Sequence, residues 1–309
     1  MVMMTSTLPI DLLHAEFGDA VQENVILGPY TSARIGGPAD ALLTIKSADE
    51  LANATRFIWE HNIPCYILGG GSNVLISDKG IRGLVILNRA KEVRFETGER
   101  PNVWCESGVV FSNLANRCAS KGLSGLEWAA TVPGTLGGAA YGNAGAFGGD
   151  ISGNLIWAEL FTQNGREKFS VEQMGYGYRT SILKRNEIRA VVLSVLLGLE
   201  NGTKEDVSVK IEEVSERRKS TQPPGASMGS MFKNPPGDHA GRLIEAAGLK
   251  GARIGNAEIS TVHGNFFINH GETSAGDVRK LIDLTRKTVQ EKTGVVLELE
   301  VELVGDWAA

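Results

Sequence analysis

Two glycine-rich runs are the parts of this sequence best suited to hold a charged ligand. Residues 69–73 read GGGSN and follow the apolar segment CYIL. Successive glycine N–H groups can form an anion-binding nest, to which Ser72 and Asn73 add side-chain donors. Residues 122–149 contain nine glycines and almost no charge. Glycine serves where backbone takes positive φ or lies against a ligand, and it costs about 1 kcal/mol per helix position, so we expect no helix in this second run.

Neither run matches a standard phosphate-binding template. The first has GGGSN and the second GTLGG, so GxGxxG fails in both, and GxxxxGK[ST] is absent from the chain. Either run alone is equally consistent with an ordinary glycine-rich loop. The two together favour a dinucleotide cofactor held outside a Rossmann frame.

Composition narrows the class of protein. The 309 residues are 42% hydrophobic and 22% charged, which suits a packed chain with room for two or three domains. The net charge is −5, so no basic surface is available for nucleic acid, and we expect no such partner. Anionic ligands must then be held by local Arg, Lys and backbone donors.

Cysteine usage and hydropathy suggest the compartment. Cys65, Cys105 and Cys118 are odd in number and far apart, which favours core thiols in a reducing compartment over a disulfide or metal site. The histidines show no ligand spacing, so we expect no metal. The longest apolar run, around 190–199, is about half of the ~20 residues that span a bilayer, and the N-terminus lacks a signal pattern. We therefore expect a cytoplasmic protein without a membrane span.

The elements that carry these runs can be read in order. The start of the chain is expected to be mobile as far as Thr31. A strand over 41–45 then precedes a helix that Ser47 and Glu50 open as a capping box and that ends by Pro64. Strands over 65–68 and 83–87 complete a small α+β unit ending near residue 82.

A second unit is expected to hold the longer glycine run. Strands are predicted at 103–105, 109–110, 155–162, 167–171 and 188–199, with a helix over 112–121, giving a mixed sheet that ends near Gly202. A helix over 204–219 joins it to a last unit. There, 221–236 contains four prolines and reads as a loop, followed by helices at 238–247 and 274–292, a strand at 265–269, and an alternating segment over 295–304.

Six motifs carry a resemblance to a known family. The sequence resembles the UDP-N-acetylenolpyruvoylglucosamine reductase (MurB) family, and the motifs span almost the whole chain in family order. They are RIGGPAD at 34–40, LGGGSNVL from 68, GLEWAATVPGTLGGAAYGNAGAFG from 125, YRTS at 178–181, GSMFKNP at 229–235 and LEVE at 299–302. Strand-like sequence resumes soon after Arg179, which leaves no room for the substrate-capping insertion of longer members, so the chain resembles the shorter, type II-like class.

The resemblance implies an α+β protein with a two-part FAD-binding fold of the vanillyl-alcohol-oxidase (PCMH) type and a C-terminal α+β substrate domain. The expected domains are 1–82 and 83–219 for FAD and 220–309 for substrate. The implied reaction is NADPH-dependent reduction of UDP-N-acetylglucosamine enolpyruvate to UDP-N-acetylmuramate. Because no histidine lies in either glycine run, we expect FAD to be bound without a covalent link, in a protein that we expect to be a monomer.

The resemblance also implies roles for particular residues. Ser230 maps to the proton donor, and Arg179 and Glu300 to the pair beside the substrate carboxylate and developing enolate, with Glu298 a second choice for Glu300. Tyr178, Arg179, Lys233 and Asn234 are expected to bind substrate, whereas Arg217, Arg218 and Lys219 suit a diphosphate and a solvated helix end equally well. The expected FAD-binding residues lie in the two runs: Leu68, Gly69, Gly70, Gly71, Ser72, Asn73, Thr131, Pro133, Gly134, Thr135, Gly137, Gly138 and Ala139.

Two other functions remain open on the sequence. An oxidase of the same fold would pass electrons to oxygen, but such oxidases lack the GSMFKNP segment. A non-catalytic protein that binds nucleotide sugars would be expected to have lost at least one of Arg179, Ser230 and Glu300, and all three are present. The segment Tyr30-Thr31-Ser32 departs from the usual Asn-Thr-Phe and puts one local cofactor contact in question.

Overall fold

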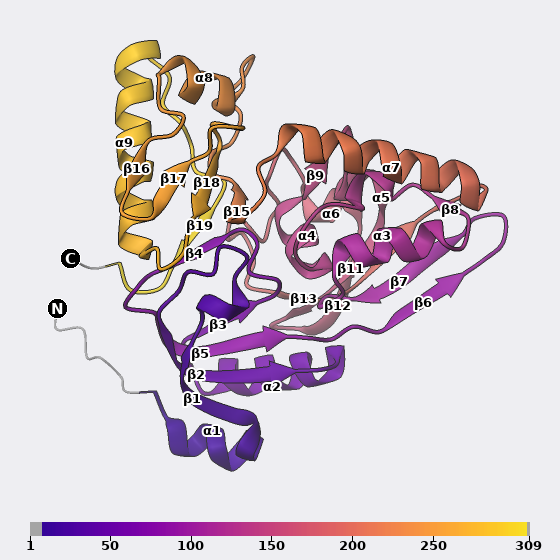
Figure 1. The fold of residues 1–309 in the computed structure, drawn as a ribbon. Coiled ribbons are helices and arrows are strands. Elements are labelled where there is room, and N and C mark those ends of the chain that lie inside the picture. The colour runs from indigo at the N-terminus through magenta and orange to yellow at the C-terminus, as the bar shows by residue number, and fades with distance from the viewer. Residues whose placement is uncertain (1–7, 308–309) are drawn as a thin grey trace.

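The computed structural model describes residues 8–307, which form three groups of elements (Figure 1). The first group surrounds a mixed four-stranded sheet of order β1-β2-β5-β3, in which β5 runs parallel to both β2 and β3. Its sheet continues to Asn88, past the boundary expected near 82. Its elements are α1 (Ile10–Phe17), η1 (Gly18–Ala20), β1 (Val21–Ile26), η2 (Gly28–Tyr30), β2 (Pro38–Ile45), α2 (Ala48–Glu60), β3 (Cys65–Leu68) and β5 (Ile81–Asn88).

The expectation of a mobile start is wrong for the described residues before Thr31. Helix α1 buries Leu13 completely, and β1 pairs with β2 along its length. The prediction for α2 is confirmed, since the Ser47 hydroxyl accepts a hydrogen bond from the Glu50 N–H at 3.1 Å. Glu50, however, accepts from the N–H of Lys46 rather than of Ser47, so the capping box is incomplete.

The second group contains a five-stranded sheet of order β12-β11-β13-β7-β6. All its pairs are antiparallel, so the expected mixed sheet is wrong here. Buried Glu106 on β7 accepts from the Ala48 N–H at 2.6 Å and so ties this sheet to the start of α2. The elements are β6 (Val93–Glu96), β7 (Asn102–Glu106), α3 (Phe111–Ala119), β8 (Leu123–Ser124), η3 (Glu127–Ala129), α4 (Leu136–Gly142), β9 (Gly145–Ala146), β10 (Gly149–Asp150), α5 (Ile151–Asn154), β11 (Leu155–Thr162), β12 (Gly165–Phe169), α6 (Val171–Met174), β13 (Val191–Gly198) and β14 (Glu200–Asn201).

Helix α4 lies inside the longer glycine run, where no helix was expected. The prediction failed because tertiary packing outweighs the intrinsic cost of glycine. Leu136 and Ala140 are fully buried, and a Cβ on Gly137 would lie 2.8 Å from the Cβ of Ser107. Glycine is therefore used within this helix for close approach rather than for positive φ.

The third group follows α7 (Lys204–Thr221), which runs along the second group towards the C-terminal elements (Figure 1). The expected loop over 221–236 contains a strand, β15, because its prolines flank the strand and leave residues 226–230 free to pair with β18. The sheet order is β15-β18-β17-β16. The elements are β15 (Ala226–Ser230), α8 (Ala240–Ala246), β16 (Arg253–Ile254), β17 (Ala257–Ile259), β18 (Phe266–Asn269) and α9 (Ala275–Thr293).

The end of the described chain returns to the first group. Strand β19 (Glu302–Val304) pairs in parallel with β4 (Val74–Ile76), which follows the GGGSN run directly. The alternating segment 295–304 is a regular strand only at these last three residues. Before them, Leu299 makes an isolated bridge to Phe232. Within residues 8–307, no helix combines the length and apolar character needed to cross a membrane.

Candidate active site

The two glycine runs, far apart in sequence, meet face to face. A Cβ on Gly70 would lie 2.7 Å from the Cα of Gly134, and the Ser72 hydroxyl lies 3.4 Å from the Pro133 carbonyl oxygen. Nearby, the Thr131 hydroxyl is buried and has no hydrogen-bond partner within the described chain. A buried hydroxyl of this kind normally has a partner, so Thr131 has an unused polar group in the longer glycine run.

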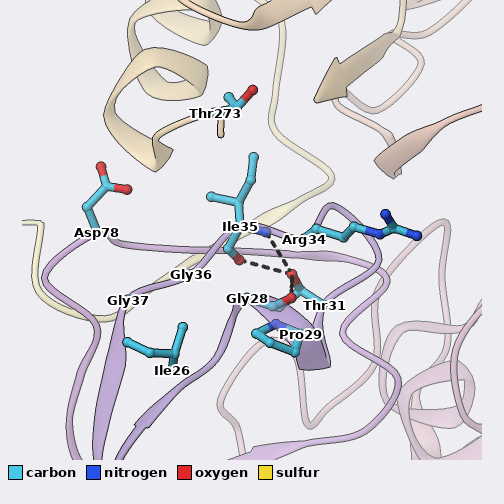
Figure 2. Close-up of a pocket in the computed structure, with 10 residues that line it drawn as sticks. All are labelled: Ile26, Gly28, Pro29, Thr31, Arg34, Ile35, Gly36, Gly37, Asp78 and Thr273. Atoms are coloured by element: carbon cyan, nitrogen blue, oxygen red, sulfur yellow. Dashed lines mark hydrogen bonds between the residues drawn. The ribbon is translucent and has the colours of Figure 1, made fainter. Parts of the chain in front are cut away.

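A tight turn supports the first run from behind. The Thr31 hydroxyl donates to the carbonyls of Gly28 and Ile35 and accepts from the Ile35 N–H, all at 3.0–3.1 Å (Figure 2). The next residue, Ser32, donates its N–H to the Gly71 carbonyl at 3.0 Å. Gly71 has φ of +60°, a conformation that glycine adopts without steric cost. Thr31 in this chain therefore acts through the backbone that fixes Gly71.

The YRTS motif forms a second tight turn. Gly177 and Thr180 exchange backbone hydrogen bonds at 3.2 and 3.3 Å, which places Tyr178 and Arg179 at the tip. Arg179 has φ of +56°, which is uncommon outside glycine and recurs at functional sites. Below the tip, the buried Ser181 hydroxyl donates to the Tyr141 carbonyl at 2.6 Å, next to the glycine-rich helix α4.

At the tip, Arg179 pairs with Glu300. Its Nε donates to Glu300 Oε1 at 2.7 Å, and its Nη2 donates to the Gly145 carbonyl at 2.7 Å. Both side chains are largely buried, with 24% of Arg179 and 16% of Glu300 exposed. Nη1 of Arg179 has no partner among residues 8–307, so part of the fork remains available to an anion.

Glu298, the second choice, is placed differently. Its side chain is 72% exposed and forms an ion pair with Lys233. The geometry therefore favours Glu300 as the buried acidic group. The other predicted substrate residue in this loop, Asn234, accepts from the Ala240 N–H at 3.1 Å through its side chain and donates its own N–H to the Tyr178 hydroxyl at 3.4 Å. Lys233 and Asn234 thus lie beside the Tyr178 turn, but both are engaged within the protein.

Ser230 lies at the end of β15 beside the Glu300 segment. The β15–β18 register shifts between Ser227 and Ser230, and Gly229 within this irregularity has φ of +75°. Such bulges turn a side chain out of the regular alternation. The next residue, Met231, accepts from the Glu300 N–H at 3.0 Å. The Ser230 hydroxyl has no hydrogen-bond partner in the described part of the chain, so it is free to donate.

The three basic residues at the end of α7, Arg217, Arg218 and Lys219, lie in different environments. Arg217 stacks on Phe147 of the longer glycine run, with its guanidinium carbon 5.8 Å from the ring centre. Burial lowers the pKa of Arg218, and no carboxylate pairs with it in residues 8–307. Lys219 is exposed. From the sequence, all three residues suit a diphosphate or a solvated helix end equally well. In the structure, Arg218 differs from the other two because it is partly buried and has no carboxylate partner in residues 8–307.

The cysteines are free thiols. Cys105 and Cys118 are buried as expected, and burial raises both pKa values, that of Cys118 to about 12. Cys65 is exposed and does not fit the expectation of a core thiol. Across residues 8–307, no group of His, Cys, Asp and Glu side chains is arranged to hold a metal ion.

One cavity lies apart from these side chains. It measures about 640 Å³ and is lined from the Gly28–Gly37 segment, Asp78 and Thr273 (Figure 2). It contains none of the predicted catalytic or cofactor residues. A smaller cavity of about 370 Å³ lies beside Trp59, Cys65 and Arg189. The convergence of chemical groups, rather than cavity size, therefore identifies the candidate site.

Comparisons with known proteins identify the family. Residues 39–168 match a family model described as an FAD binding domain, and residues 220–304 match one described as the UDP-N-acetylenolpyruvoylglucosamine reductase C-terminal domain. The fold and site thus define an FAD-containing oxidoreductase built from a two-part cofactor unit and a C-terminal α+β domain, as predicted. Within this class, the chain belongs to the UDP-N-acetylenolpyruvoylglucosamine reductase family.

The relatives cover nearly the whole chain. The reductase of Rubrobacter xylanophilus is 45% identical over 90% of this chain and 93% of its own length, and that of Bacillus subtilis is 42% identical over 92% and 94%. The crystal structure of the Thermus caldophilus enzyme aligns with a TM-score of 0.77 at 37% identity, covering 90% of this chain and 97% of that one.

The residues present fit FAD. The contact of Gly70 with Gly134 brings the two glycine-rich runs together, and successive glycine N–H groups of this kind can bind a pyrophosphate. The unpartnered Thr131 hydroxyl adds a polar group in the same loop. Arg89 holds the run from the other side by donating to the Gly69 carbonyl at 2.9 Å. The predicted cofactor runs are therefore brought together, although they belong to different sheets.

Proposed function

We propose that this protein reduces UDP-N-acetylglucosamine enolpyruvate to UDP-N-acetylmuramate with electrons from NADPH. The observation that carries the proposal is the largely buried Arg179–Glu300 pair, placed between the longer glycine run and the Ser230 loop. Reduction of a vinyl ether next to a carboxylate needs a hydride donor for one carbon, a group that stabilises the enolate, and a proton donor for the other carbon. The chain offers candidates for the second and third of these needs.

Arg179 orients the substrate carboxylate in this proposal. Its Nε and Nη2 are fixed by Glu300 and Gly145, so the guanidinium is preorganised, and Nη1 is the donor proposed to bind the substrate carboxylate. Preorganised donors directed at developing charge lower the barrier because they need no reorganisation during the reaction. Glu300 holds this cation in place and acts beside the developing enolate.

Ser230 donates the proton that completes the reduction. Support comes from its free hydroxyl, its place at the end of an irregular strand, and the backbone link from Met231 to Glu300. A positioned general acid contributes about 10² to 10⁴-fold to the rate. The side chain needs no permanent charge for this role, since a hydroxyl can donate directly to an adjacent carbanion.

FAD, when bound, supplies the hydride chemistry between NADPH and the enolpyruvyl group. The chain's contribution is to bind and orient it through backbone N–H groups and small polar side chains, without a covalent link. The residues proposed to hold it are Leu68, Gly69, Gly70, Gly71, Ser72, Asn73, Thr131, Pro133, Gly134, Thr135, Gly137, Gly138 and Ala139.

The UDP portion is proposed to lie towards Tyr178, Lys233 and Asn234. Glu298, which pairs with Lys233, is 72% exposed and can move into solvent, so a diphosphate can replace it as the partner of Lys233. Arg218 is the strongest addition from the basic run, because a half-buried guanidinium without a counter-ion favours an anion.

We also propose the domain boundaries, the compartment and the oligomeric state that the sequence predicts. The FAD unit comprises 1–82 and 83–219, the substrate domain comprises 220–309, and the protein acts as a cytoplasmic monomer of the shorter class. Residues 175–190, between α6 and β13, contain no helix or strand. This supports the absence of a substrate-capping insertion after Arg179.

The function can be tested with the purified, FAD-loaded protein. NADPH should be consumed only when UDP-N-acetylglucosamine enolpyruvate is present, and mass spectrometry should find a product heavier by two hydrogen atoms. Consumption of oxygen in place of the enolpyruvyl substrate would instead identify an oxidase. Saturable binding of the substrate with no NADPH consumption would identify a nucleotide-sugar binding protein.

A further inference from the structure

Asn73 ends the GGGSN run, but its side chain reaches towards the substrate side of the site. Its Nδ2 donates to the main-chain carbonyl of Glu300 at 3.1 Å, and its own carbonyl accepts from the Glu302 N–H at 3.0 Å. We propose that Asn73 is a positioning residue for Glu300, and that through it the FAD-binding run and the substrate carboxylate site are coupled. The proposal rests on the proposed function for the role of Glu300.

Glu300 is held at three separate points. Its N–H donates to Met231, its carboxylate accepts from Arg179, and its carbonyl accepts from Asn73. The segment needs these anchors because residues 295–301 form no regular strand. Loss of the Asn73 donor leaves a partly buried carbonyl without a partner and frees the Glu300 peptide to rotate. The carboxylate on that residue would then lose its fixed position.

The other side of Asn73 is rigid. Gly71 is held by Ser32 through a 3.0 Å hydrogen bond, and Gly70 lies against Gly134. Immediately after Asn73, β4 is paired in parallel with β19. A shift of the FAD-binding run therefore also moves Glu300 and Glu302, because Asn73 is hydrogen-bonded to both. Coupling of this kind is reciprocal, so FAD strengthens substrate binding by the factor by which substrate strengthens FAD binding.

Asn269 offers a matched control. Its Nδ2 also donates to a main-chain carbonyl in another part of the fold, that of Ala33, at 2.8 Å, and it does not contact the Glu300 segment. Asn269→Ala removes the same type of bond between the first and third groups. It should leave substrate binding and both halves of the reaction unchanged.

The first test compares Asn73→Ala and the isosteric Asn73→Asp with the FAD-loaded wild-type protein. FAD affinity of Asn73→Ala, measured by flavin fluorescence, should stay within about threefold, because the Asn73 side chain bonds the Glu300 carbonyl and only the Asn73 main chain is proposed to hold FAD. Substrate affinity, measured from the shift in flavin absorbance of the oxidised protein, should weaken on the order of tenfold. Reoxidation of reduced flavin by the enolpyruvyl substrate should slow about 10- to 100-fold, while reduction by NADPH should be unchanged.

A double-mutant cycle separates action through Glu300 from an independent role. In the Glu300→Gln background, Asn73→Ala should slow reoxidation less than about threefold, because the carboxylate that it positions is already absent. Full additivity of the two changes would overturn the proposal. So would loss of FAD in Asn73→Ala, which would show that the Asn73 side chain acts first on the cofactor. If the wild-type protein itself fails to pass electrons to the enolpyruvyl substrate, the proposed function fails instead.

Discussion

Arg179 and Glu300 lie 121 positions apart in sequence, yet the Nε of one donates to Oε1 of the other at 2.7 Å. Each is also tied by a hydrogen bond to one of the two glycine runs, Arg179 through the Gly145 carbonyl and Glu300 through Asn73. The groups expected to act on substrate are therefore fixed to the segments expected to hold FAD. Correct placement of one depends on the other.

Glu300→Gln should preserve FAD binding and lower turnover by orders of magnitude. The neutral amide no longer balances the Arg179 guanidinium, so the cation that orients the substrate carboxylate loses its anchor. Steady-state kinetics with flavin content measured in parallel tests this expectation. Glu298→Gln is the matched control, because Glu298 is mostly exposed, and it should change turnover little. The reverse ranking would show that the wrong carboxylate has been assigned.

Gly70→Ala should weaken FAD binding at least about tenfold, or 1.4 kcal/mol. The added Cβ would lie 2.7 Å from the Gly134 Cα, so the two glycine runs must separate. This reason differs from a direct clash with the cofactor, because the opposing backbone alone forbids the side chain. Flavin fluorescence on titration measures the affinity.

Gly142→Ala is the control for that change. Gly142 lies at the end of α4 in the longer glycine run, which also contains Gly134, and a Cβ on Gly142 meets no atom within 4 Å. Its FAD affinity should equal that of the wild-type protein. Equal losses in Gly70→Ala and Gly142→Ala would mean that the contact between Gly70 and Gly134 does not control the site.

The sequence predicted elements where local signals dominate. The Ser47 cap, the strand over 65–68 and the helix over 204–219 follow from capping, apolar runs and helical spacing, and each is confirmed. Helix α4 was missed because its stability comes from burial of Leu136 and from the close approach of Gly137 to Ser107. No local pattern contains that information.

The resemblance predicted which residues form the site, but only the structure shows how they are arranged. Periodicity could not show that Glu298 is exposed while Glu300, two residues later, is largely buried, since a regular strand would place both on one face. Nor could it assign the Asn73 side chain to the Glu300 carbonyl across 227 positions. Such contacts arise only when three groups of elements have packed together.

The protein should become less stable as the pH falls below about 6.5, because of His263 in the loop between β17 and β18. Burial, followed by the nearby Lys250 ammonium, lowers the pKa of His263, while Glu245 opposes this shift. Neutral His263 accepts from the Asn265 N–H at 3.1 Å through Nδ1. A histidine whose folded pKa is depressed contributes stability above its ordinary value of 6.5, and that stability is lost as protonation proceeds.

His263→Asn tests this pH dependence, because its amide oxygen can replace Nδ1 as an acceptor but does not titrate. The melting temperature of the variant should fall less between pH 7.5 and pH 5.5 than that of the wild-type protein. These two pH values bracket roughly the unfolded pKa of histidine. Parallel curves for the two proteins would show that His263 does not contribute to the acid sensitivity.

FAD should leave the protein on denaturation. None of the five histidines lies in either glycine run, and the cysteines are outside both, so neither run offers a side chain for covalent attachment. Precipitation with acid should release all flavin into the supernatant, where absorbance measures it. Yellow colour that stays with the washed protein pellet would contradict this expectation.

Ser230 should supply the proton in the substrate half of the reaction. Rapid mixing of Ser230→Ala with each reactant, followed by flavin absorbance, separates the two halves. Reoxidation of reduced FAD by the enolpyruvyl substrate should slow about 10² to 10⁴-fold, while reduction by NADPH and substrate affinity stay nearly unchanged. Equal slowing of both halves, or a loss explained by weaker substrate binding, would rule out Ser230 as the proton donor and make it a structural residue of the β15 bulge.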